Sequence, residues 1–128
     1  MVEVIESYHR AEVNNFVDKF YEEFLKSDPR IAPIFKKTDF KEQKRLLVQG
    51  VFNLLEYAKG SAIGRMSVNR LAETHGRKKL NIPPELYKLW VNSLMVALAE
   101  RDPKFTPQLD MKWRQAIQKG IDLMISQY

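Results

Sequence analysis

Apolar residues recur every three or four positions in several separate segments, and this spacing constrains the fold more than any other feature of the sequence. Residues at i, i+3, i+4 and i+7 share one face of an α-helix, so each segment predicts a helix with one buried face. The alternating pattern of a half-buried strand is absent. We therefore predict an all-α protein with about five substantial helices and one or two short ones. The apolar stripes run through residues 13–24, 40–58, 68–75, 86–98 and 109–124.

Capping residues agree with these helices. Asp28-Pro29 and Thr106-Pro107 each place a capping side chain before a proline, which suits the first position of a helix. Gly60 follows the second stripe, where a residue in the left-handed conformation commonly ends a helix. We expect helices to begin at both prolines and one to end near Gly60.

Size and composition limit the class of protein. A chain of 128 residues predicts one domain, spanning residues 1–128. Its apolar runs are too short to cross a bilayer, and its first residues do not resemble a secretory signal. Without cysteine there is no disulfide, thiolate nucleophile or cysteine zinc site, which fits a cytoplasmic protein. The net charge is +5, but basic and acidic residues are interleaved, so we expect no nucleic-acid partner.

Three polar residues interrupt the apolar stripes: Tyr21, Gln43 and His75. A buried polar group without a partner costs roughly 1–3 kcal/mol, so three of them suggest a shared polar object in the core. Each also has an ordinary interpretation. Tyr21 would be a core tyrosine with its hydroxyl at the edge, Gln43 a residue at the rim of its stripe, and His75 a structural histidine with a hydrogen-bond partner.

The available ligand chemistry narrows the options. Two histidines and no cysteine cannot supply the four nitrogen or sulfur ligands of a structural zinc site, and no glycine-rich phosphate loop is present. His9 lies far along the chain from the other polar positions, and we expect it to be exposed. One protein ligand suffices where a porphyrin supplies four more, as when a proximal histidine holds haem iron. His75 is the candidate for that ligand.

The residues resemble the globin family, in particular bacterial single-domain globins and the globin domain of flavohaemoglobins. The stretch "FYEEFLKSDPRIAPIFKKTDFKEQKRLL" is similar to the region of that family around its B, C and E helices. Tyr21 matches the tyrosine of the B helix, and Phe35 the phenylalanine that stacks on haem. Gln43 falls at the distal position. His75 matches the proximal histidine, with the family's haem-contacting leucine one turn earlier at Leu71.

This resemblance implies a globin fold, a three-over-three helical sandwich with a shortened N-terminal helix. It also implies haem b (iron protoporphyrin IX) with His75 on the iron. Tyr21 and Gln43 would stabilise the bound ligand from the distal side. The other implied cofactor-binding residues are Phe35, Leu47, Leu71, Ile82, Arg77 and Lys78.

The resemblance implies reversible binding of O2, for storage or delivery, with NO and CO as further ligands, by a monomer or weak homodimer. Two alternatives stay open: a nitric oxide dioxygenase or peroxidase with a separate reductase, and a gas or redox sensor acting through a partner. The glutamate that strengthens the proximal histidine of flavohaemoglobins falls at Tyr128 here, and this sequence holds no reductase domain. Both departures weaken the enzyme interpretation, so the chain is more an oxygen-binding protein than an enzyme.

The histidine count predicts the coordination of the iron. Since His9 precedes the first predicted helix, the distal side has no second histidine to bind the metal. The reduced protein without added ligand is expected to be five-coordinate and high-spin by visible and resonance Raman spectroscopy. In the ferric state we expect water or hydroxide, or Tyr21 at raised pH. A low-spin ferrous spectrum would contradict this prediction.

Overall fold

The computed structural model describes residues 1–128, and its regular structure is entirely helical. The all-α prediction is therefore confirmed. No helix has the length and hydropathy that a membrane span requires. The seven helices are α1 (Val2–Val13), α2 (Phe16–Lys26), α3 (Ile31–Ile34), α4 (Phe40–Ala58), α5 (Ala62–His75), α6 (Leu86–Arg101) and α7 (Pro107–Ser126).

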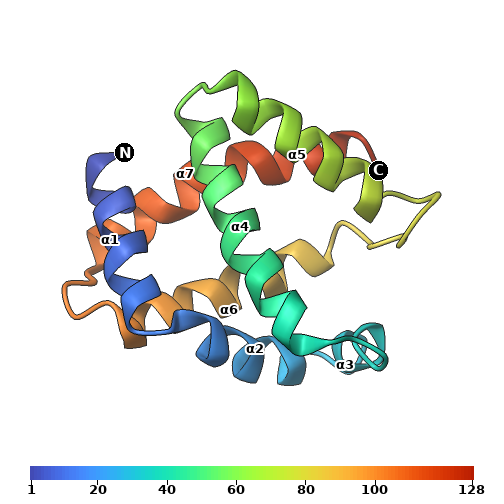
Figure 1. Ribbon diagram of the computed structural model, residues 1–128, viewed down its shortest axis with the longest axis horizontal. Helices are drawn as coiled ribbons and strands as arrows, with labels where there is room; N and C mark the ends of the chain where they lie inside the picture. The colour runs from blue at the N-terminus through green and yellow to red at the C-terminus, as the bar shows by residue number, and fades with distance from the viewer.

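The long helices cross one another around α4, which runs through the centre of the view in Figure 1. α2 lies along α6, α4 packs on both α5 and α7, and α5 also contacts α7. α1 rests against α6 and α7 at the side of the molecule away from the α5–α6 loop (Figure 1). This arrangement places α2 beside the start of α4, and α5 beside its other end.

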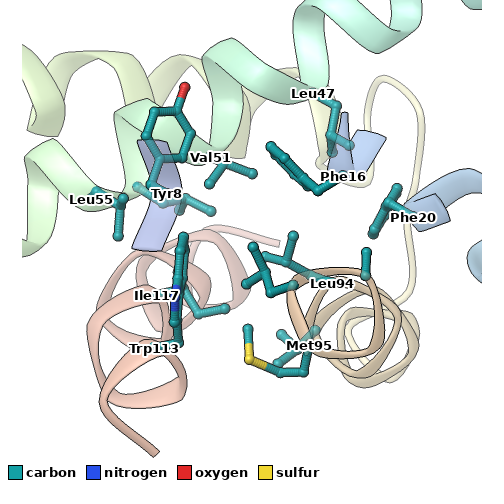
Figure 2. Close-up of a cluster of buried hydrophobic side chains, with 14 of the residues drawn as sticks. Tyr8, Phe16, Phe20, Leu47, Val51, Leu55, Leu94, Met95, Trp113 and Ile117 are labelled. Carbon is teal, nitrogen blue, oxygen red and sulfur yellow. The ribbon is translucent and has the colours of Figure 1, made fainter. Parts of the chain in front are cut away.

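The predicted apolar stripes meet in one core of 27 buried hydrophobic residues. Figure 2 shows how side chains from five helices gather there, among them Phe16 and Phe20 of α2, Leu94 of α6 and Trp113 of α7. All four of these side chains are fully buried. Because each fully buried large apolar side chain contributes about 1.5–3 kcal/mol, this shared core holds the helices in place.

The first helix, α1, was not identified from the periodicity, which began its first segment at Val13. Its buried face contains a polar residue, Ser7, and a buried network holds it. The Ser7 hydroxyl donates to Asp102 at 2.6 Å and accepts from Trp113 Nε1 at 2.9 Å, while Arg10 Nε donates to Asp102 at 2.6 Å. Burial alone would raise the pKa of Asp102, but these donors and the Lys104 backbone hold it below its usual value. This pairing with distant partners anchors α1 together with its buried apolar residues Val4, Tyr8 and Ala11.

The helix ends confirm two of the capping predictions and correct a third. Thr106 Oγ1 accepts from the backbone of the residue three positions on, and Pro107 is the first residue of α7. Gly60 follows α4 with φ of +87°, the left-handed conformation expected there. The predicted helix start at Pro29 is wrong, because α3 begins at Ile31. Asp28 instead accepts from the backbone N–H two residues on, at 2.8 Å, forming a local turn.

Gly64 allows α5 to begin against the end of α4. A Cβ atom at this position would lie 2.4 Å from the backbone nitrogen of Tyr57 and 2.6 Å from the carbonyl carbon of Glu56. Both atoms belong to the α4 backbone, which cannot yield as a flexible side chain can. Glycine at position 64 therefore sets how closely α5, the helix that carries His75, approaches α4.

Replacing Gly64 with alanine is expected to lower the free energy of unfolding by about 1–3 kcal/mol, because the two helices must move apart. Gly50→Ala is the matched control, since a Cβ in the middle of α4 meets nothing within 4 Å. Better helix propensity should make that control neutral or up to about 1 kcal/mol more stable. Urea unfolding followed by far-UV circular dichroism measures both, and equal effects would contradict the close-packing account.

Candidate functional site

Two of the three polar residues that interrupt the stripes contact each other. Gln43 Nε2 donates a hydrogen bond to the Tyr21 hydroxyl at 3.0 Å, joining α4 to α2. Asp39 caps α4 by accepting from the backbone N–H of Lys41, so the helix begins at Phe40 and Gln43 lies one turn in. The tyrosine is only 4% exposed, and its hydroxyl satisfies the half-buried amide.

The Tyr21 hydroxyl is kept protonated and retains a free donor. Burial raises the pKa of Tyr21 to about 12, and the hydrogen bond from Gln43 lowers it only in part. The hydroxyl oxygen accepts from Gln43, so its own O–H can donate to a further group. An added molecule beside Tyr21 would therefore meet a neutral hydrogen-bond donor rather than a tyrosinate.

Aromatic rings surround this hydrogen-bonded pair. The rings of Phe35 and Phe40 pack edge-on against Tyr21, with centroid distances of 5.8 and 5.4 Å, and lie 5.9 Å from each other. Phe24 adds a fourth ring, 6.0 Å from Phe35. Phe35 was expected from the sequence to be a site residue, whereas Phe40 was not. The sequence feature that could have identified Phe40 is an aromatic residue at the first position of α4, one turn before Gln43.

His75 is the last residue of α5, and its ring is oriented by the helix itself. Its Nδ1 lies 2.8 Å from the carbonyl oxygen of Leu71, one turn earlier. Thr74 Oγ1, which donates to the same carbonyl, lies 3.2 Å from Nδ1. Since a carbonyl only accepts, Nδ1 carries the proton, and Nε2 presents its lone pair with no hydrogen-bond partner in the protein. Thr74 was not expected from the sequence to contact this histidine.

The environment of His75 favours the neutral imidazole. Burial lowers its pKa, and the hydrogen bond to the Leu71 carbonyl raises it by less. Metal ions bind the neutral form, and a carbonyl that accepts from Nδ1 both fixes the tautomer and makes Nε2 a better ligand. The geometry therefore suits a metal ligand better than the alternative structural interpretation, because Nε2 has no hydrogen-bond partner.

The remaining predicted residues lie on α4 and around the end of α5. Leu47 is buried one turn after Gln43, and Leu71 and Ile82 pack half-buried against the core. The backbone N–H of Ile82 donates to the carbonyl of His75 at 2.9 Å, so the loop after α5 folds back onto the histidine.

The two predicted propionate partners, Arg77 and Lys78, lie exposed in this same loop. The Arg77 guanidinium stacks over the ring of Tyr128, 4.7 Å from its centroid. The Tyr128 hydroxyl donates to Asn81, whose φ of +52° is a left-handed turn. The C-terminal residue therefore supports the loop, a contact that no local pattern indicated.

The donor set fits haem rather than a metal ion held by protein groups alone. The structure contains no group of three or more histidine, cysteine, aspartate or glutamate side chains that could bind a metal. His9 is exposed and stacks edge-on against Tyr8, as expected for a surface residue. One free imidazole nitrogen, at His75, is the ligand that a porphyrin-bound iron needs from its protein.

These features describe an all-α protein in which His75 leaves one ring nitrogen without a hydrogen-bond partner. A model of the globin family matches residues 18–124, and the chain belongs to the globin family. It is thus a haem-binding globin, as the resemblance predicted.

The fold is also similar to a solved structure from Pseudomonas aeruginosa PAO1, of a protein described as structurally highly homologous to a human haemoglobin. The TM-score is 0.95 and the sequences are 38% identical, over 98% of this chain and 95% of the other. This match confirms the predicted globin fold. A comparison with curated proteins gave no match.

Proposed function

We propose that the chain binds one haem b through Nε2 of His75 and reversibly binds O2, with NO and CO as further ligands. The observation that carries the proposal is the hydrogen bond from His75 Nδ1 to the Leu71 carbonyl, which leaves Nε2 unengaged in a globin fold. The shared hydrophobic core supports one globin domain of residues 1–128. The lack of cysteine suits a reducing cytoplasm.

Haem, when bound, supplies an iron with one coordination position for a diatomic ligand. His75 would hold the iron, and Leu71 and Ile82 would provide apolar surface on the same side of the site. Phe35 and Leu47 would provide apolar surface on the side of Tyr21 and Gln43. Arg77 and Lys78 are basic and exposed beside His75, which suits the propionates. Apolar surroundings keep water from the ligand and make each hydrogen bond to it stronger.

Tyr21 and Gln43 select the ligand by its polarity. O2 is more polar than CO when bound, so it gains more from the Tyr21 hydroxyl and the Gln43 amide. Each donor contributes a net ~1–1.5 kcal/mol, and 1.4 kcal/mol corresponds to a tenfold change in affinity. The raised pKa of Tyr21 keeps this donor protonated at neutral pH. We propose storage or delivery of O2 on this ground.

The variant Tyr21→Phe is expected to raise the O2 dissociation rate by about tenfold, because it keeps the ring and removes one donor. CO dissociation should change much less. Tyr8→Phe is the control, since Tyr8 is a similarly buried tyrosine whose hydroxyl donates to the carbonyl of Val48 instead of bonding to Gln43. Flash photolysis and ligand replacement measure both rates. Equal changes for O2 and CO would favour a steric explanation and contradict the role of the hydroxyl.

The variant His75→Ala is expected to abolish stoichiometric haem uptake or to give a water-ligated spectrum, because no other side chain can replace Nε2. His9→Ala, at an exposed position, should bind haem like the parent protein. Titration of each purified protein with haem, followed by its visible spectrum, measures the effect. An unchanged ferrous deoxy spectrum in His75→Ala would rule out this ligand.

A further inference from the structure

The excess positive charge of the chain lies on two segments, residues 35–46 and 70–88. Each holds five basic and two acidic residues, so together they carry a net +6. The other 97 residues hold 11 basic and 12 acidic residues, a net charge of −1. Basic and acidic residues are interleaved along the sequence, but the net positive charge is confined to these two segments. These are also the segments that carry Phe35, Gln43 and His75.

The two segments lie at the same end of the molecule. In Figure 1 the α3–α4 loop and the α5–α6 loop both lie on the right, below and beside the end of α5. Arg30, the N-cap of α3, forms an ion pair of 3.3 Å with Glu85, the N-cap of α6. This ion pair joins the chain just before the first segment to the second segment. We call residues 35–46 and 70–88 together the basic face.

Most cations of the basic face have no acidic partner within the protein. Eleven of the 21 basic side chains form no ion pair, and eight of those lie on this face. All eight are exposed: Lys36, Lys37, Lys41, Arg70, Arg77, Lys78, Lys79 and Lys88. The two propionates of a haem would neutralise two charges, so an excess of about four remains to act on a partner.

We propose that the basic face docks an acidic electron-donor protein, which reduces the haem iron. This inference rests on the proposed function. In the docked complex the reduced cofactor of the partner would supply one electron and be oxidised, and the haem iron that His75 would hold would be reduced from the ferric to the ferrous state. A single-sign surface around a redox centre raises the association rate of an oppositely charged partner by about 10- to 1000-fold.

Exposed apolar residues on and beside this face favour a protein over a small anion. Ile34 is 42% exposed, Leu46 is 47% exposed and Leu80 is 62% exposed. A small anion would gain nothing from them, whereas weak electron-transfer complexes combine a small contact area with a charged rim. A membrane surface fits less well, because it is usually bound by the apolar face of an amphipathic helix. The buried residues of α4 are turned to the core, and the exposed Ile63 and Met66 of α5 lie outside the basic face.

The test measures reduction of the ferric protein by a reduced flavodoxin, a small acidic flavoprotein, in a stopped-flow instrument. Between about 10 mM and 300 mM ionic strength the second-order rate constant should fall at least tenfold, because salt screens the attraction. Photoreduced lumiflavin, which is neutral, should show little salt dependence.

A pair of matched variants locates the effect. Lys36→Glu/Lys79→Glu changes two unpaired cations of the basic face, and neither residue belongs to the proposed haem or ligand contacts. Arg65→Glu/Lys119→Glu produces the same net charge at two unpaired, exposed positions outside it. At low salt the first should reduce the flavodoxin rate at least tenfold, and the second should stay within about twofold of the parent protein. An equal loss of the flavodoxin rate in both double variants would overturn the proposal, and so would a rate of the parent protein that does not depend on salt.

A binding measurement separates failure of the docking face from failure of the haem function. Flavodoxin added to the ¹⁵N-labelled protein as purified should shift amide signals mainly within residues 35–46 and 70–88. That footprint without haem uptake would overturn the haem function alone. Normal haem uptake and O2 binding with no footprint would overturn the docking face alone. The docking proposal would also be overturned if the protein sedimented with phosphatidylserine vesicles but did not respond to flavodoxin. The basic face would then be a membrane-binding surface.

Discussion

The hydrogen bond between Nδ1 of His75 and the carbonyl of Leu71 is the interaction on which the site depends. Both groups lie in the last turn of α5, at the negative end of the helix dipole, which strengthens the carbonyl as an acceptor. The bond fixes the tautomer and the direction of the ring, and burial keeps the imidazole neutral. Its geometry needs α5 to reach His75 intact, and Gly64 lets that helix start close against α4.

The distal half of the site depends instead on packing between distant segments. Tyr21 and Gln43 are 22 residues apart and meet because α2 crosses the start of α4. Phe35 and Phe40 then enclose the tyrosine with their rings. This combination gives a buried hydroxyl that is protonated, held in place, and still able to donate. The sequence positions of the polar residues alone would not distinguish this hydrogen-bonded Tyr21 from an ordinary core tyrosine.

The protein contains a second buried polar cluster, and comparing the two shows what marks a functional site. Ser7, Asp102 and Trp113 are also buried polar or amphipathic side chains, but they satisfy one another. That cluster anchors α1 and leaves no donor for a ligand. At the candidate site, His75 Nε2 and the Tyr21 O–H have no such partner. Unused hydrogen-bonding or ligand capacity, rather than buried polarity, separates the candidate haem site from a structural network.

The sequence by itself determined the helical class, most helix positions, the Thr106 cap and the three polar positions in the stripes, because periodicity and capping act over a few residues. Periodicity alone did not identify α1, whose stripe is interrupted by Ser7, and a short N-terminal helix was implied only by the resemblance to globins. It also misplaced the start of α3, where Asp28 bonds within a turn. Only the tertiary structure decided that Gln43 bonds to Tyr21 and that the unpaired cations gather at one end. Those relations join residues far apart in the chain, and only the packing of the core brings them together.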